Sequence, residues 1–332
     1  MIIFIIHSIL ISEVFMNLGR NFRQIMGILL PSQRLRLALR EKFFWEYVKD
    51  KIKTKIITSQ FKYNLSIVLI VKNAATYTDE WINFHRLVGV NHFYIFDNES
   101  EDNLKEVLEP YIKEGIVTYT FWKGKRQQVV VYNYALRKYR FETKWMAFID
   151  DDEFIVPVSE TSIIKVLEEI NPEYGLCIPW VMYGSSGIKK KTDKLVIEKF
   201  IFREDINIKR YISCKQILNP RNTDIVKIHS SFFTNNGPPV DENGNFVNNN
   251  KTGIADTTCQ SVNKIRINHY HTKSEEEFLL KKSRGDAYSK NNKYVKATIG
   301  YFNSMDKNCN NVKDDIMKKY VEPVKSLIRH KN

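Results

Sequence analysis

Three short apolar runs, and the polar residues that follow them, indicate the fold. The runs are Leu65-Ser-Ile-Val-Leu-Ile-Val71, His92-Phe-Tyr-Ile-Phe96 and Trp145-Met-Ala-Phe-Ile149, each with the length and composition of a buried strand. The segments 79–88, 104–111 and 128–139 read as helices between them, and 116–121 reads as a further strand. Strands that alternate with helices form βαβ units. The sequence therefore predicts an α/β protein with a mostly parallel, Rossmann-like central sheet flanked by helices.

Polar clusters follow three of these strands. Lys72 and Asn73 come after the first, Asp97 and Asn98 after the second, and the run 150–153 after the last. In open α/β sheets, ligands bind beyond the carboxyl ends of the strands. The clusters therefore predict a ligand site at one edge of the sheet.

The run Asp150-Asp-Asp-Glu153 brings four carboxylates together. Adjacent carboxylates repel one another, so they require a cation or buried hydrogen-bond donors. Mg²⁺ or Mn²⁺ would suit oxygen ligands that also meet a diphosphate. In an extended chain Asp150 and Asp152 point to one side and Asp151 to the other. A solvated acidic turn is the alternative, but the position after an apolar strand favours a metal site.

A second motif, His269-Tyr-His271, lies far downstream. Its two histidines share one face if the segment is a strand, and imidazoles could complete a metal shell. The alternative is a pair of histidines that are hydrogen-bonded in the core. Basic residues that suit a phosphate follow the motif, namely Lys273, Lys281, Lys282 and Arg284.

Composition and charge narrow the class of protein. The 332 residues include 51 basic and 38 acidic side chains, a net charge of +13, and 43% are hydrophobic, which excludes a disordered chain. The excess charge lies in residues 1–63 and 264–332, whereas 64–263 is nearly neutral. This split argues against a nucleic-acid groove, and we expect no nucleic-acid partner. The four cysteines form no CxxC pair and indicate buried thiols in a reducing compartment.

The chain ends read as basic helical extensions. Residues 1–63 contain apolar residues at helical spacing between arginines, which fits a helix on an anionic membrane surface or one packed on the main domain. The apolar run at 1–12 is shorter than the roughly 20 residues of a spanning helix and lacks signal-peptide features, with Met16 as an alternative start. We expect a cytoplasmic protein, peripheral at most to the inner face of a membrane. The expected parts are a basic extension over 1–63, a catalytic domain over 64–288 and a basic helical tail over 289–332.

Taken together, the motifs resemble the family 92 glycosyltransferases of the GT-A fold, from about residue 65 to 288. The order and spacing of the whole set, rather than any one piece, carry the resemblance. The pieces are Val71-Lys-Asn73, Glu80-Trp-Ile-Asn-Phe-His85, the run 97–102, the acidic run 150–153, Gly184-Ser-Ser-Gly187, Asn219-Pro-Arg221 and His269-Tyr-His-Thr-Lys-Ser274.

This resemblance implies a metal-assisted, inverting transfer of a sugar from a nucleotide-sugar donor, with a UDP-sugar favoured. The acceptor would be a glycan or lipid-linked glycan, in a setting such as surface polysaccharide or lipopolysaccharide synthesis. Its residues imply the following roles: metal binding by Asp150, Asp152 and His269, less directly His271; nucleoside contact by Asp97; and pyrophosphate contact by Lys273 and Arg284. Lys72, Asn73, Asn98 and Asp151 are further candidates for donor binding. One departure is Ala74, which stands where the family's first motif has a Glu.

Glu153 and Asp241 are the candidate bases that would deprotonate the acceptor hydroxyl. The turn-rich segment 234–253 would close over substrate or form plain surface, and Trp180, Tyr183 and 184–187 would form an acceptor wall or core. A nucleotidyltransferase is one alternative, but it would need a Gly-rich loop, which 71–76 lacks. A non-catalytic basic protein that binds membrane or nucleic acid is the other.

Overall fold

The computed structural model describes residues 61–207, 213–247, 261–283 and 299–328. The chain divides between Gln60 and Phe61, and all of the described residues belong to the second unit. Residues 1–60 of the expected basic extension, including its membrane-facing helix, lie outside the described residues. Within the described ranges, no helix is both long enough and apolar enough to cross a bilayer.

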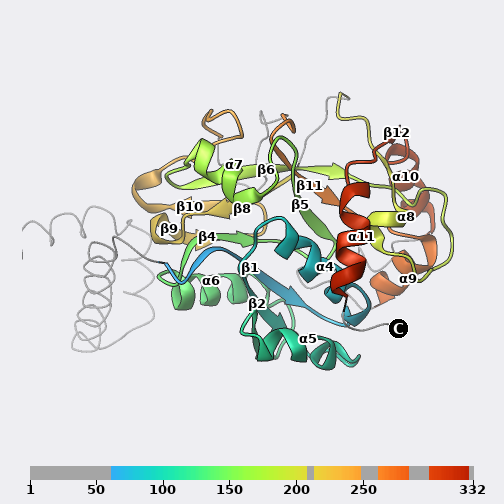
Figure 1. The fold of residues 1–332 in the computed structure, drawn as a ribbon, viewed down its shortest axis with the longest axis horizontal. Coiled ribbons are helices and arrows are strands. Elements are labelled where there is room, and N and C mark those ends of the chain that lie inside the picture. The colour runs from blue at the N-terminus through green and yellow to red at the C-terminus, as the bar shows by residue number, and fades with distance from the viewer. Residues whose placement is uncertain (1–60, 208–212, 248–260, 284–298, 329–332) are drawn as a thin grey trace, which may run out of the picture. The chain divides into compact units, whose positions relative to one another are not determined.

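An eight-stranded sheet forms the centre of this unit, in the order β3-β2-β1-β4-β8-β6-β11-β5 (Figure 1). The first four strands are parallel: β1 (Tyr63–Val71), β2 (His92–Asp97), β3 (Val117–Phe121) and β4 (Thr143–Phe148). The others are β5 (Glu153–Pro157), β6 (Gly175–Met182), β8 (Cys214–Leu218) and β11 (Ile265–His269). Strand β8 is antiparallel to β4 and β6, and β5 is antiparallel to β11, while β6 and β11 are parallel. The parallel arrangement predicted from the sequence thus holds for the first half, and the second half is mixed.

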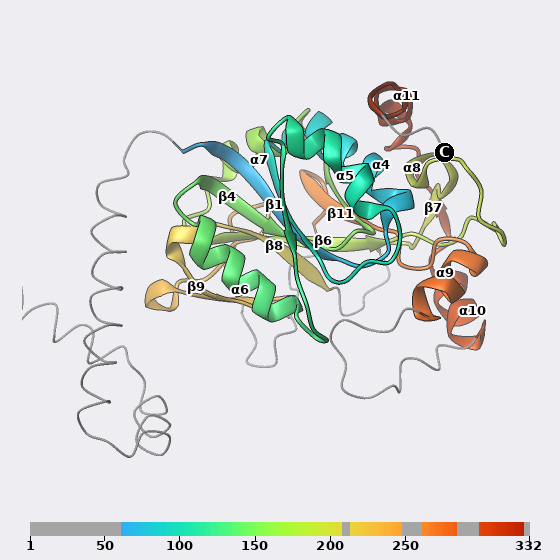
Figure 2. The ribbon, with the colours of Figure 1, turned by 90° about the horizontal axis from the view of Figure 1, so that it is seen from below.

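Helices cover both faces of the sheet, which explains why β1 is apolar along its whole length. Ile67 and Leu69 pack in one core with α4 (Ala75–Leu87), α5 (Leu104–Lys113) and α7 (Ile163–Ile170). Val68 and Ile70 point to the opposite core, which α6 (Gln128–Tyr139) covers. Figure 2 shows α4, α5 and α7 on one side of the sheet and α6 on the other. The predicted class, an α/β protein with a central sheet flanked by helices, is confirmed.

The C-terminal part contains α9 (Glu275–Ser283), α10 (Ile299–Asn308), β12 (Val312–Lys313) and α11 (Lys318–Leu327). The ring of Tyr320 in α11 lies 5.1 Å from that of Phe84 in α4. Strand β12 pairs with β7 (Phe202–Arg203), and Asp314 binds Arg203 and Arg266. Residues 299–328 thus pack against the sheet domain, and the division at 288 into a catalytic domain and a basic helical tail over 289–332 stays a prediction.

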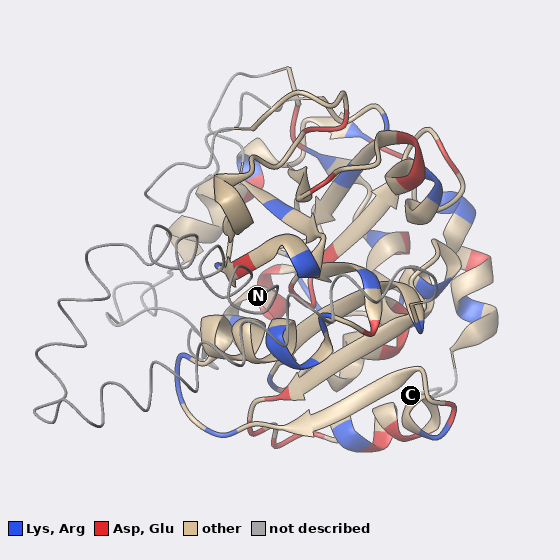
Figure 3. Ribbon diagram, turned by 90° about the vertical axis from the view of Figure 1, so that its left-hand side faces the viewer, with Lys and Arg blue, Asp and Glu red and all other residues tan. Residues whose placement is uncertain are grey.

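Short elements complete the unit. A hairpin of β9 (Thr223–Val226) and β10 (Ser231–Phe233) follows β8, and the helix α8 (Val196–Lys199) precedes β7. Two 3-10 turns, η1 (Pro220–Asn222) and η2 (Thr234–Asn236), flank the hairpin. Basic and acidic residues are interspersed over the described elements in the view of Figure 3.

Candidate active site at the carboxyl edge of the sheet

The pairing of β5 with β11 brings the acidic run and the histidine motif together. Phe148, at the end of β4, lies beside Val68 of β1, and the turn after it carries Asp150 to Asp152. The chain then enters β5, where Glu153 pairs with His269 of β11. The backbone N–H of Tyr270 also donates to the carbonyl oxygen of Asp152 at 2.9 Å. Two motifs more than a hundred residues apart thus form one site.

Asp152, His269 and His271 form a group that could hold a metal ion. Their ligand atoms lie within 4.8 Å of one another, and Asp152 Oδ2 is 3.5 Å from His269 Nε2. These three predicted ligands therefore fit a cation. One carboxylate with two imidazoles suits Mn²⁺ or another transition ion better than Mg²⁺, which prefers oxygen ligands alone.

The carboxylate of Asp152 is ionised although its residue is only 1% exposed. Burial opposes ionisation, but the Lys281 ammonium, which contacts Oδ2, and the neighbouring His269 hold the pKa of Asp152 well below its usual range. A buried carboxylate that keeps its negative charge is a suitable cation ligand.

Asp150 has different partners. Its Oδ1 accepts a hydrogen bond from Gln128 Nε2 at 2.8 Å, and its Oδ2 binds Lys215 Nζ at 2.9 Å. Burial would lower the pKa of Lys215, but Asp150 and Glu153 together raise it above its usual value, so the ammonium stays charged. The structure thus separates the two predicted carboxylate ligands, with Asp152 beside the histidines and Asp150 on a buried lysine. Sequence reasoning missed Lys215, whose signal was a single charge inside the apolar strand 214–218.

The side chain of Glu153 holds the turn that carries Asp150. This side chain is fully buried, and Oε2 accepts the Asp150 backbone N–H at 2.9 Å and lies 3.6 Å from Lys215 Nζ. Burial, together with Asp150 and Asp152, raises the pKa of Glu153 well above its usual range. A carboxyl group enclosed in this way does not face an acceptor, which argues against the predicted role as base.

The structure does not bring Asp241, the other candidate base, to this site. Its Oδ1 accepts the backbone N–H groups of Asn243 and Asn245 at 2.8 and 2.9 Å, so the carboxylate organises a turn. The next residue, Glu242, accepts the backbone N–H of Ile265 at 3.0 Å, at the start of β11. His269 ends that strand four residues later, about 13 Å away at the rise of a strand.

Lys273, predicted to contact pyrophosphate, lies against the aromatic ring of Tyr77. Its ammonium is 3.6 Å from the ring centroid, and the residue is only 5% exposed. Burial lowers the pKa of Lys273, and the charges of Asp151 and Asp152 oppose that effect. The predicted donor residue Asp151 is half-buried beside the lysines at this edge. Arg284 lies outside the described residues.

The ring of Tyr77 is itself held in place. Its hydroxyl donates to Glu277 Oε1 at 2.9 Å, and the same oxygen binds Lys199 Nζ at 3.1 Å. Lys199 and Glu277 have side chains that are 3% and 1% exposed. A buried ion pair therefore fixes the surface on which Lys273 rests.

The remaining predicted donor residues lie at the same edge, on the far side of β1. Asp97 is level with Val71 in the parallel register, and its oxygens accept the Ser100 backbone N–H at 2.9 Å and the Tyr119 hydroxyl at 2.8 Å. Asp97 is 4% exposed, and its hydrogen bond with Ser100 holds the loop after β2 in place. Its predicted contact with a nucleoside stays a prediction.

The loops after β1 and β2 are cross-linked by the other candidates. Asn73 donates its backbone N–H to Ser100 Oγ at 2.9 Å, and Lys72 Nζ lies 3.7 Å from Glu101 Oε1. Asn98 donates from Nδ2 to the carbonyl oxygens of residues 122 and 124 at 3.0 and 2.9 Å. These contacts fix the loops at this edge of the sheet, and the predicted role of these residues in donor binding stays a prediction.

Ala74, where the family pattern has a Glu, is 1% exposed directly before α4. The first N–H of that helix, from Ala75, donates to Asp102 Oδ2 at 2.9 Å. A carboxylate from the neighbouring loop thus satisfies the helix start.

Of the predicted acceptor wall, Trp180 borders the site. Its ring lies 4.3 Å from that of His269 and 5.0 Å from that of His229. Tyr183 is buried, and its hydroxyl accepts from Arg266 at 3.0 Å. Segment 184–187 is fixed by Asp306 and Asn310, which accept the backbone N–H groups of Ser185 and Ser186.

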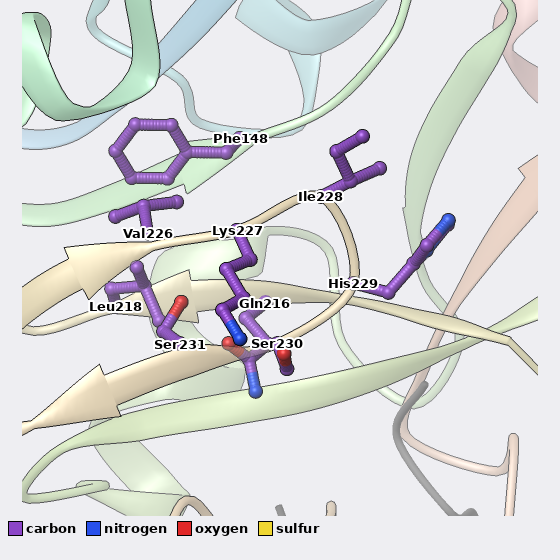
Figure 4. Close-up of a pocket in the computed structure, with 9 residues that line it drawn as sticks. All are labelled: Phe148, Gln216, Leu218, Val226, Lys227, Ile228, His229, Ser230 and Ser231. Atoms are coloured by element: carbon purple, nitrogen blue, oxygen red, sulfur yellow. The ribbon is translucent and has the colours of Figure 1, made fainter. Parts of the chain in front are cut away.

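His229 lines a narrow crevice between the hairpin and β8 (Figure 4). The crevice is too narrow for a water molecule, so it is no substrate pocket. Figure 4 shows the His229 ring turned away from the other lining side chains. Burial lowers the pKa of His229 to about 4, so the imidazole is neutral at pH 7.

The sequence comparisons identify the family to which this chain belongs. Residues 71–313, more than two thirds of the chain, match the family model described as Glycosyltransferase family 92. The protein thus belongs to glycosyltransferase family 92, which confirms the resemblance stated from its motifs.

Plant proteins are among the similar sequences. The galactan β-1,4-galactosyltransferase GALS3 of Arabidopsis thaliana is 33% identical over 168 residues, which cover 46% of this chain and 33% of the relative. A glycosyltransferase family 92 protein of Ricinus communis is 33% identical over 94 residues, 28% of this chain and 16% of the relative. GALS1 of Arabidopsis thaliana is 23% identical over 265 residues, which cover 75% of this chain and 49% of the relative. The chain thus spans less than half the length of each of these relatives.

Among solved structures, that of residues 1–349 of S. aureus TarS aligns with 47% of each chain. The identity is 17% and the TM-score is 0.34, a likeness too low to support an argument.

Proposed function

We propose that this site transfers a sugar from a UDP-sugar to a hydroxyl group of a glycan acceptor, with Mn²⁺ held by Asp152, His269 and His271. One observation carries the proposal, namely that a carboxylate and two imidazoles lie within 4.8 Å of one another at the carboxyl edge of the sheet. The lysines at positions 273 and 281 lie beside the same carboxylate.

The reaction breaks the bond between the anomeric carbon and the diphosphate oxygen and forms a bond from that carbon to the acceptor oxygen. The acceptor hydroxyl loses its proton to a base, and UDP leaves. A bound divalent cation would stabilise the negative charge that develops on the leaving diphosphate. Lys273, fixed on Tyr77, supplies positive charge for the same purpose without having to reorganise. Trp180, beside His269, offers an aromatic face to a sugar ring.

UDP-galactose is the first donor to test, because relatives of this chain are named galactan β-1,4-galactosyltransferases. Their β-linkage would correspond to inversion from an α-linked UDP-sugar, in agreement with the inversion implied by the resemblance. The cytoplasmic, membrane-peripheral location and the part in surface polysaccharide or lipopolysaccharide synthesis stay predictions.

Thermal unfolding tests the donor site directly. Wild type and Asp152→Asn would be heated with UDP, GDP or CDP, each with and without Mn²⁺. Because a ligand that binds only the folded state stabilises it by mass action, we expect UDP with Mn²⁺ to raise the midpoint of the wild type alone. A parallel assay would follow UDP release from UDP-galactose in the presence of galactan. The absence of a shift with every nucleotide in a well-folded wild type would refute the site.

A further inference from the structure

Lys281 and a metal ion would use the same oxygen atom of Asp152. The Lys281 ammonium contacts Asp152 Oδ2, and this is the oxygen that lies 3.5 Å from His269 Nε2, on the histidine side of the carboxylate. We propose that Lys281 is an intramolecular competitor of the metal, bound to Asp152 until the cation enters and then transferred to the donor diphosphate. This inference rests on the proposed metal site.

The two acidic residues of the site are paired with lysines of different character. Lys215, which binds Asp150, has a side chain only 1% exposed and lies close to Glu153 as well. The side chain of Lys281 is 35% exposed. Lys215 is therefore enclosed, whereas Lys281 reaches Asp152 from the surface and has solvent on one side. This contrast identifies Asp152 as the carboxylate whose partner can be exchanged.

The helix that carries Lys281 is anchored one turn earlier. Glu277 of α9 accepts from Lys199, Tyr77 and Ser274, and its side chain is 1% exposed. Glu277 and Lys281 are four residues apart and so share one face of the helix. Because the first part of α9 is fixed, exchange requires only rotation about the bonds of the lysine side chain.

Charge accounts for the destination of the released ammonium. When a divalent cation binds Asp152 and the histidines, it repels the Lys281 ammonium from that oxygen. The diphosphate that the same cation would bind is a new source of negative charge, and the charge of Asp151 also acts on Lys281. Lys281 would thus lower metal affinity in the absence of donor and favour joint binding of metal and nucleotide.

Isothermal titration of the full chain with MnCl₂, with and without UDP, tests this competition. The variants are Lys281→Met, Lys281→Arg, Asp152→Asn and a control, Lys325→Met. Lys325 pairs with Glu198 and Glu322, and its side chain is 40% exposed, so this control removes the same charge from a lysine of similar exposure. Thermal unfolding would verify that each variant is folded.

We expect Lys281→Met to bind Mn²⁺ about tenfold more tightly than the wild type in the absence of UDP, since a charged hydrogen bond no longer has to be broken. Lys281→Arg should bind no more tightly than the wild type, and Lys325→Met should be unchanged. With Mn²⁺ saturating, UDP should bind several-fold more weakly to Lys281→Met.

The proposed competition would be overturned if Lys281→Met bound Mn²⁺ no more tightly than the wild type. It would also be overturned if neither the wild type nor Lys281→Met bound Mn²⁺. The Asp152→Asn variant distinguishes a wrong competition from a wrong metal site. If Asp152→Asn loses Mn²⁺ binding while Lys281→Met gains nothing, only the competition is wrong. If Asp152→Asn binds Mn²⁺ as the wild type does, the metal assignment itself is wrong.

Discussion

The carboxylate of Glu153 accepts the backbone N–H of Asp150 at 2.9 Å, so one acid of the run 150–153 fixes the backbone of another. Lys215 lies between their side chains, 2.9 Å from Asp150 Oδ2 and 3.6 Å from Glu153 Oε2. The turn that presents Asp152 is therefore built on a buried lysine. The residues that hold it in place, Glu153 and Lys215, are not among the three proposed metal ligands.

Lys215→Met should destabilise the protein by about 3–5 kcal/mol, because it removes the buried ammonium that binds Asp150 and lies beside the enclosed Glu153. Urea unfolding measures the loss. Lys264→Met, which breaks an exposed pair with Glu169, is the control and should cost much less, because solvent screens the exposed pair. Equal effects of the two variants would contradict the role given to Lys215.

Asp152→Asn should reduce kcat/KM by about 100-fold or more, since it weakens the cation site while keeping the shape of the side chain. The folded state should survive, and the midpoint of thermal unfolding without ligand is the check. Activity within threefold of the wild type would be incompatible with Asp152 as a metal ligand.

Asp241→Asn should leave kcat within about threefold of the wild type, because the Asp241 carboxylate organises a turn. A catalytic base would instead show a loss of about 100-fold or more on the same substitution. Steady-state kinetics with the preferred donor distinguish the two cases.

Tyr77→Leu should weaken UDP binding about three- to tenfold, because it removes the ring that holds the Lys273 ammonium. Tyr77→Phe keeps the ring and loses only the hydrogen bond to Glu277, so its effect on UDP affinity should be smaller. Titration with UDP provides the comparison, and equal losses in both variants would assign the effect to the hydroxyl.

Glu80 should make the protein less stable as the pH rises from about 4.5 to about 7. Burial raises the pKa of Glu80 to about 7, although the backbone N–H groups of Ile197 and Val196 and the charges of Lys273 and Lys199 oppose the shift. In that range the folded protein keeps a proton that the unfolded chain releases, so the free energy of unfolding falls with increasing pH, by up to about 3 kcal/mol.

Urea unfolding of the wild type and Glu80→Gln at pH 4.5, 6 and 7.5 measures this dependence. The amide does not titrate, so the difference between the two proteins should change in favour of Glu80→Gln with increasing pH. A constant difference across the series would rule out titration of Glu80.

The local sequence pattern was sufficient to predict the strands and helices in the first half of the fold. The predicted strand 92–96 and helix 128–139 correspond to β2 and α6 almost residue for residue, because the first is a short, continuous apolar run and the second has apolar residues at helical spacing. The strand directions after β4 were not predictable in this way. The insertion of β8 between β4 and β6 depends on long-range pairing that no local pattern encodes.

The site was predicted in the same uneven way. The motifs themselves pointed to Asp152, His269 and His271, because their side chains carry recognisable metal chemistry. The partners of Asp150 and the enclosure of Glu153 depend on Lys215, which comes from a distant strand. Whether a carboxylate is a ligand or a support is thus decided by tertiary contacts.

The register of β5 against β11 has a consequence for how such sequences diverge. Strands β5 and β11 form five register pairs, and residue 153 is paired with residue 269. Successive residues of a strand point to opposite faces of the sheet. A single inserted residue in 265–268 would turn both histidines away from Asp152 while every motif remained legible in the sequence. Loss of activity in a relative could therefore come from the spacing between intact motifs.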